Sequence, residues 1–392
     1  MADPLIGGPS VLFVDDDPAL LAGLRRMLRS RHPACRLHFA ASAEEALEVL
    51  TVEHLDGVVS DMRMPRVDGA ELLAGVRRRR PGAVRVILSG QTAPTAAIRA
   101  ARIAHRFLDK PTPPDALDAT IGSIAGLASL PLDADLRAAL GALVCLPTPL
   151  ATIDALADAL SAPAPSPLVL REAIDGDLGI VAKLCQLAST AFLSVPSAFR
   201  DELDILTRLD PAHLRQLVRA GCIAVPPADR VVDRLASVLA GHARRVSTLA
   251  AAIHGGPLPP AAALAARLCD VGVLAAAVAD VPSAGQAGHG GPAPRTEHDG
   301  ATLRLASAFL LDLWGLPHPV ADLVGRSHPA RLPRGGSANA ATAIALADAL
   351  DAEEAGLPGH AGLLQRLEGA VGTPLVRRAR ALAGTHDHQV RR

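Results

Sequence analysis

Carboxylates close two short apolar runs near the start of this 392-residue chain. Residues 11–14 are followed by Asp15–Asp17, and residues 57–60 are followed by Asp61. Carboxylates at the carboxyl ends of neighbouring parallel strands converge on one crevice, at the point where strand order reverses in an open α/β sheet. Mg²⁺ suits such a crevice, because it takes a few carboxylates, keeps waters and bridges to phosphate oxygens. The pattern therefore predicts a magnesium-dependent site for a phosphoryl group.

A hydroxyl and an ammonium end two later predicted strands. Residues 85–88 precede Ser89, and residues 106–109 precede Lys110. A carboxylate such as Asp61 can act as a nucleophile toward a phosphoryl donor and form an acyl phosphate. Because it must meet an anionic donor among other acids, the chemistry needs positive charge, which a lysine and Mg²⁺ supply.

Alternating strands and helices are expected to position these groups. Short β-branched runs alternate with amphipathic stretches, which is typical of βαβ units and a parallel sheet. Apolar residues recur at helical spacing between Leu20 and Leu28, directly after the acidic loop. Ser42, with Glu45 three residues later, predicts the start of a second helix.

The order and spacing of these pieces suggest a family. With Met64-Pro65, Asp68-Gly69 and Lys110-Pro111 in register with the acids, the first 120 or so residues resemble the receiver domain of two-component response regulators. We place this domain at residues 1–128. The resemblance implies an α/β flavodoxin-like, doubly wound parallel sheet.

The resemblance also implies a phospho-acceptor and a metal. Asp61 would be the phosphorylated residue, and Asp16, Asp17 and Asp61 would hold Mg²⁺. Asp15 carries less weight, because only two of three consecutive acids normally face the metal in this family. The alternative for the acid triplet alone is a cap on the following helix, a common use of Asp near helix starts.

Further roles follow from the same resemblance. Ser89 would be the switch hydroxyl, Phe107 the rotating aromatic, and Lys110 the cation that pairs with the phosphate, ahead of a cis proline at Pro111. The phosphoryl donor would be a sensor histidine kinase or a phosphotransfer protein. Receivers frequently dimerise on phosphorylation, so a homodimer belongs among the expected partners.

Length and composition bound the rest of the chain. A chain of 392 residues, 49% of them hydrophobic, is typical of two or three globular domains. The net charge of -1 offers no basic surplus of the kind that nucleic-acid binders show. Five cysteines without a CxxC pair fit a reduced, cytosolic setting. Arg267, Asp270 or Pro interrupts the Ala-rich stretches before about 18 apolar residues accumulate, and no signal peptide is evident, so we expect a soluble cytoplasmic protein.

After about Leu130 the pattern becomes helical, which predicts a second, all-α domain. Residues 146–149 (Leu-Pro-Thr-Pro), residues 174–189 and the Trp-Gly-Leu-Pro turn at 314–317 resemble the HDOD domain, a helical output module related to HD-type metal-dependent phosphohydrolases. We expect a linker at 129–143, an HDOD-like domain at 144–355, and a helical or flexible tail at 356–392.

The resemblance allows the HD metal ligands to be checked one by one. His242 stands for the first histidine, and Cys269 with Asp270 for the His-Asp pair. The next histidine falls on Leu303, and the paired histidines fall on Ser327-His328. A metal site of this type needs several ligands fixed around room for an attacking water, and leucine cannot ligate a metal. Hydrogen-bonded or surface roles are the alternative for His242 and His328, so we expect a degenerate, non-catalytic site.

Three classes of function compete. The leading hypothesis is a response regulator, phosphorylated on Asp61, whose helical domain binds a downstream signalling protein and is not an enzyme. The alternative is a cyclic-dinucleotide phosphodiesterase of the HD-GYP kind, which the missing ligands and the missing Gly-Tyr-Pro disfavour. A DNA-binding transcription regulator is a third class, disfavoured because the C-terminal part has no compact basic helix-turn-helix pattern.

Overall fold

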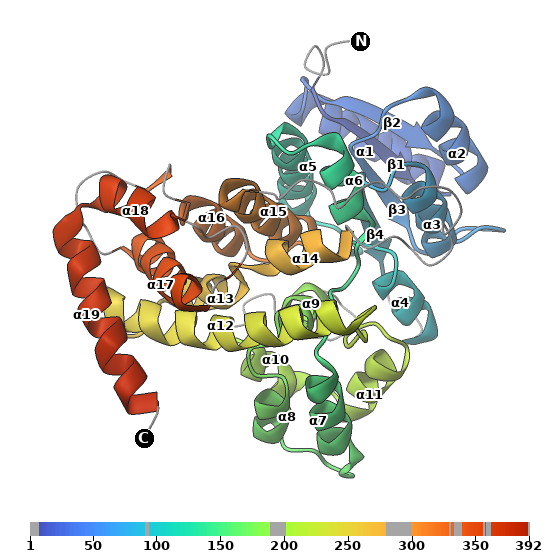
Figure 1. The fold of residues 1–392 in the computed structure, drawn as a ribbon. Coiled ribbons are helices and arrows are strands. Elements are labelled where there is room, and N and C mark those ends of the chain that lie inside the picture. Colours follow the sequence, from blue (N-terminus) through green and yellow to red (C-terminus); the bar gives the residue numbers. More distant parts are fainter. Residues whose placement is uncertain are drawn as a thin grey trace, which may run out of the picture. The chain divides into compact units, whose positions relative to one another are not determined.

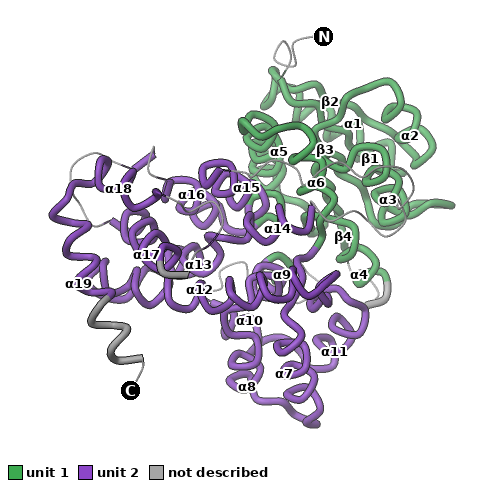
Figure 2. Tube along the Cα trace, in the orientation of Figure 1, with its two compact units in different colours: residues 1–144, 186–197, 312–315 green, residues 145–185, 198–311, 316–392 purple. Residues whose placement is uncertain are grey.

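The computed structural model describes residues 8–90, 94–188, 201–279, 299–328, 331–332, 339–355, 357 and 362–390 (Figure 1). The chain divides into two compact units (Figure 2). Unit 1 comprises 1–144, 186–197 and 312–315, and unit 2 comprises 145–185, 198–311 and 316–392.

Unit 1 is built on a five-stranded parallel sheet with strand order β2-β1-β3-β4-β5. The strands are β1 (Ser10–Val14), β2 (Arg36–Ala40), β3 (Gly57–Asp61), β4 (Val84–Ser89) and β5 (Arg106–Asp109). Every residue of β1 and β3 is buried, as expected for central strands of a parallel sheet that is covered on both faces. This order is that of flavodoxin-like folds, so the predicted doubly wound sheet is confirmed.

The strand register determines which side chains meet. The chain passes from β1 out to β2 and returns to β3 on the other side of β1, so strand order reverses between β1 and β3. Val14 pairs with Ser60 and Leu88 pairs with Asp61. The residue after Val14, Asp15, therefore follows β1 at the level of Asp61.

Helices connect and follow the strands of unit 1. They are α1 (Pro18–Arg31), α2 (Ala43–Val52), α3 (Gly69–Arg79), α4 (Pro94–Ala101), α5 (Pro114–Ser129) and α6 (Ala134–Ala142). Ser42 Oγ accepts a hydrogen bond from Glu45 N at 3.2 Å, which confirms the predicted cap of α2.

Part of the segment that the sequence analysis assigned to a linker is ordered as α6. Its Gly141 carbonyl accepts a hydrogen bond from the buried guanidinium of Arg85 in β4, with Nη2 at 2.9 Å. Arg85 Nε also donates to Ile103 O at 2.8 Å. Because a buried guanidinium requires such acceptors, α6 packs as an integral part of unit 1.

Unit 2 is helical in its described residues, as expected for an all-α domain. Its helices are α7 (Leu150–Ser161), α8 (Pro167–Ala173), α9 (Leu178–Ala188), α10 (Glu202–Arg208), α11 (Pro211–Arg219), α12 (Arg230–His254), α13 (Pro260–Leu268), α14 (Val271–Ala279), α15 (Gly300–Leu313), α16 (His318–Arg326), α17 (Ala340–Ala355), α18 (Leu363–Val371) and α19 (Thr373–Val390). The last two occupy the segment predicted as a helical or flexible tail.

The long helix α12 is central to unit 2 and packs extensively against α17. Its buried residues recur at three- and four-residue spacing, which gives one continuous apolar face. Asp229 caps its start, and Gly255 ends it in the left-handed region with φ 92°. Residues 260–279, which span α13 and α14, are long and apolar enough to cross a membrane by composition, but 72% of their apolar 18-residue window is buried inside the protein, as in a core helix.

Candidate functional site

Three charged groups meet at the carboxyl ends of β1, β3 and β5. Lys110 Nζ lies 2.6 Å from Asp61 Oδ1 and 2.6 Å from Asp15 Oδ2. The two acids are nearly enclosed, with 3% of Asp15 and 8% of Asp61 exposed. The predicted convergence of Asp61 and Lys110 at the reversal of strand order is therefore present in the structure.

Electrostatics keep this lysine charged. Burial lowers the pKa of Lys110, but the hydrogen bonds to Asp15 and Asp61, together with their charges, outweigh burial and raise the pKa above its ordinary value. The ammonium compensates one negative charge of the acid pair at neutral pH. The remaining negative charge makes the site suitable for a further cation.

The predicted metal pair Asp16 and Asp17 needs correction. Asp17 is exposed and is the N-cap of α1, where its Oδ1 accepts hydrogen bonds from Ala19 N at 2.8 Å and Leu20 N at 3.3 Å. Its carboxylate thus serves the cap that was the alternative for the acid triplet. Asp15, which the sequence analysis set aside, takes the place beside Asp61. The strand register could have identified it, since the first acid after β1 lies level with Asp61.

The residues after Asp61 fold back against it. Asp61 Oδ2 accepts a hydrogen bond from Arg63 N at 3.1 Å, and Gly69 N donates to Met62 O. A Cβ at Gly69 would lie 2.1 Å from Asp61 O, so no larger residue fits there without a shift of the backbone. Asp68 caps α3 by accepting from Glu71 N. The Asp68-Gly69 pair therefore has a packing role beside the candidate acceptor.

The predicted switch residues occupy the neighbouring strand ends. Ser89 ends β4, and its carbonyl accepts a hydrogen bond from Lys110 N at 2.8 Å. Ser89 Oγ donates to Gly90 O at 3.0 Å. Phe107 in β5 is partly buried against the apolar core of the sheet, and the Lys110-Pro111 peptide is cis. Ser89 and Lys110 are thus linked through the backbone at the acid site.

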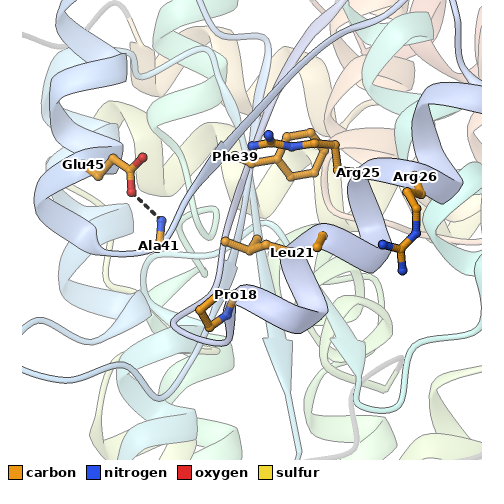
Figure 3. A pocket seen from close by; sticks show the side chains of 8 residues that line it. Pro18, Leu21, Arg25, Arg26, Phe39, Ala41 and Glu45 are labelled. Atoms are coloured by element: carbon orange, nitrogen blue, oxygen red, sulfur yellow. Dashed lines mark hydrogen bonds between the residues drawn. The ribbon is translucent and has the colours of Figure 1, made fainter.

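A separate hollow lies between α1 and β2 (Figure 3). It has a volume of about 420 Å³, and Leu21, Arg25 and Phe39 are among its lining residues. The Arg25 guanidinium lies 4.9 Å from the centre of the Phe39 ring. The acids at the strand ends, Asp15–Asp17 and Asp61, are not among its lining residues.

Comparison with known proteins identifies the N-terminal part. Residues 11–122 match the family described as response regulator receiver domain. Residues 11–122 are a receiver domain. It is 38% identical over 108 residues to the transcriptional regulatory protein GlrR of Escherichia coli (strain K12), covering 27% of this chain and 24% of that protein.

Two further proteins are similar to part of this chain. The sensor kinase CckA of Brucella abortus (strain 2308) is 41% identical over 93 residues, covering 23% of this chain and 9% of that protein. The solved signal receiver domain of an HD domain-containing protein from Pseudomonas fluorescens Pf-5 is 29% identical and covers 30% of this chain and 94% of that one, with a TM-score of 0.28. This chain spans about a quarter or less of the length of the two curated relatives.

Outside the receiver domain, the predicted HD positions are only partly brought together. His242 lies mid-way along α12 and is fully buried. Its Nε2 is 2.9 Å from Asp270 Oδ2 and 3.1 Å from Asp348 Oδ1, and its Nδ1 is 2.6 Å from Asp351 Oδ2. Burial lowers the pKa of His242, but these three carboxylates outweigh burial and raise it to about 11.

The remaining predicted HD positions are not arranged as ligands. Burial and the charge of Asp270 raise the pKa of the Cys269 thiol, and its Sγ lies 3.4 Å from Ala266 O. Leu303 is a core residue of α15. His328 is partly buried, and burial lowers its pKa. Among the described residues, His242 and Asp270 are the predicted positions whose ligand atoms lie 2.9 Å from each other, and Cys269 Sγ lies 3.4 Å from Asp270 Oδ2.

Asp348 and Asp351 on α17 were not predicted from the sequence. Their three-residue spacing on an otherwise Ala-rich helix was the available signal, because it places two acids on one helical face. His242, Asp270 and Asp348 offer ligand atoms within 4.8 Å of one another. A histidine that ligates a metal must offer a lone pair, whereas carboxylates face both ring nitrogens of His242. With a proton on each ring nitrogen His242 has no lone pair to offer, so a metal could bind this group only after Nε2 loses its proton.

Proposed function

We propose that this protein is a two-component response regulator whose receiver domain accepts a phosphoryl group on Asp61 from a sensor histidine kinase or phosphotransfer protein. The observation that supports it most is the position of Lys110, which lies 2.6 Å from both Asp15 and Asp61. A buried acid at a strand end, next to a fixed cation, is the arrangement that phosphoryl acceptance requires.

Each of these residues of the receiver domain would have a separate role in phosphoryl acceptance. Asp61 would attack the phosphorus, and Lys110 would pair with the phosphoryl oxygens once the acyl phosphate forms. Ser89 would donate its hydroxyl to the same group, and Phe107 would change rotamer as the loop after β4 moves inward. Asp15, Asp16 and Asp61 would hold Mg²⁺, which supplies positive charge to the site when bound.

We propose further that the helical part, residues 144–355, is a non-catalytic HDOD-like output domain that binds a downstream signalling protein. Leu303 in place of a ligand and the enclosure of both nitrogens of His242 by carboxylates support this. The HD-GYP phosphodiesterase alternative would need an open metal site there. A soluble, cytoplasmic location and a phosphorylation-dependent homodimer belong to the same proposal.

An affinity capture with the full chain from native cell extract tests the proposed switch. The wild type with beryllofluoride and Mg²⁺ should retain a protein that Asp61→Asn under the same conditions does not. Equal retention by both would contradict control of the output by Asp61. In parallel, cyclic-dinucleotide hydrolysis that disappears in Asp270→Ala would favour the phosphodiesterase over the binding module.

A further inference from the structure

Opposite charges balance one another inside unit 2. The carboxylates of Asp270, Asp348 and Asp351 face the cationic side chains of His242, Arg245 and Arg304. We call these six residues the ion cluster. They come from α12, the α13–α14 turn, α15 and α17. With the histidine protonated, the formal charges of the cluster sum to zero.

The two arginines of the ion cluster differ in burial. Arg245 lies toward the surface and forms a two-pronged pair with Asp351, with Nε 2.6 Å from Oδ1 and Nη2 3.0 Å from Oδ2. Arg304 is enclosed, with 6% of the residue exposed. Its Nη1 donates to Cys269 O at 2.9 Å, and its Nη2 donates to Asp348 Oδ2 and lies 3.8 Å from Asp270 Oδ1.

Arg304 thus bridges the same two carboxylates that form the candidate ligand group with His242. Two enclosed carboxylates this close cannot both ionise without a positive charge beside them. A divalent metal is one source of that charge. A guanidinium is another, because it stays protonated and offers several donors in a fixed plane.

The geometry points to Arg304 as a built-in cation that takes the place of a metal ion between Asp270 and Asp348. This inference rests on the proposed non-catalytic role of the helical part and names the group that keeps metal out. Its consequence is that the fold of unit 2 needs no metal. The same acids become a metal site only when the guanidinium is removed.

Matched substitutions in the full-length protein test this. Arg304→Gln removes the charge but keeps a donor, Arg304→Lys keeps a charge, and Arg304→Gln with Asp348→Asn removes the site. Zn²⁺ is the probe, because it accepts histidine and carboxylate ligands. The receiver acids are common to all variants, so any zinc bound there cancels in the comparison.

Arg304→Gln should retain one more zinc per chain after dialysis than the wild type. Zinc at about a hundredfold over its dissociation constant should then raise the Tm of this variant by about 5 °C or more. The wild type, Arg304→Lys and the double variant should show neither gain. If Arg304→Gln is insoluble without metal, recovery of soluble protein by zinc, absent in the double variant, is the equivalent readout.

Two results would overturn the inference. One is zinc retained by the wild type and lost in the single variant Asp348→Asn, which would mean that the metal coexists with Arg304. The other is Arg304→Gln binding no more zinc than the wild type, whether soluble or refolded. Phosphodiesterase activity of the wild type would instead contradict the proposed non-catalytic function, so the two failures are distinguishable.

Discussion

The corrected role of Asp17 leads to a quantitative prediction. Asp17→Ala removes the acceptor for Ala19 N and Leu20 N at the start of α1. Loss of an N-cap acceptor costs about 1 kcal/mol, within a range of about 0.5–2. Asp17→Ser keeps an acceptor and loses only the charge near the helix dipole, which is worth roughly 0.3–1 kcal/mol at an exposed position. Hydrogen exchange of α1 by mass spectrometry measures the difference. A cost of about 1 kcal/mol corresponds to about fivefold faster exchange for Asp17→Ala where exchange follows the opening equilibrium.

Magnesium titration of the same variants separates the cap from the metal site. Asp17→Ser should change Mg²⁺ affinity by less than about fivefold, because an exposed charge that is not a ligand contributes under about 1 kcal/mol. Asp15→Asn should lower the affinity by about tenfold or more, since it removes a buried carboxylate beside Asp61. The reasoning would be refuted if Asp17→Ser weakened Mg²⁺ binding more than Asp15→Asn does.

Two further predictions concern other parts of the chain. Burial raises the pKa of Asp177 to about 7 despite backbone hydrogen bonds from Ile180 and Gly179. Because this folded-state pKa lies above the ordinary value of an aspartate, the stability present below pH 4 is lost as the pH rises through 7. Asp177→Asn should therefore be more stable than the wild type at pH 8, by at most on the order of 4 kcal/mol in urea unfolding, and equal to it near pH 4. If Asp177→Asn were no more stable than the wild type at pH 8, the raised pKa of Asp177 would be contradicted. Separately, Ser89→Ala should still bind beryllofluoride at Asp61 but show a smaller change in hydrogen exchange over residues 94–110, and an undiminished change would rule out the proposed coupling.

The fold and the acceptor side of the receiver site were predictable from the sequence for a definable reason. Each functional residue ends or directly follows a predicted strand, and parallel strands bring their carboxyl ends to one edge. Asp61 and Lys110 therefore lie 2.6 Å apart, and Ser89 ends the strand between theirs. The choice among Asp15–Asp17 was not predictable from types alone, because it depends on where β1 stops and where α1 starts. The cap made by Asp17 decides it.

The ion cluster of unit 2 was harder to predict for the opposite reason. His242 and Asp348 are separated by 106 positions, and Arg304 and Asp348 by 44. No local spacing links them, and Ala-rich helices give little indication of which faces pack together. The resemblance to HD sites pointed to His242 and Asp270, but it gave no sign of Arg304 or of the acids on α17. Tertiary packing of α12 against α17 determines this part of the structure.

Labelling of Asp61 tests the central claim most directly. The full-length protein should take up phosphoryl from a cognate kinase or acetyl phosphate when Mg²⁺ is present, with the label on the peptide that contains Asp61. The label should be absent in Asp61→Asn, which lacks the acceptor. It should also be absent in excess chelator, because Asp15 and Asp61 share a single counter-ion, Lys110, and without Mg²⁺ their remaining negative charge repels the incoming anion. Undiminished labelling of Asp61→Asn, or equal labelling of the wild type in chelator, would contradict the account.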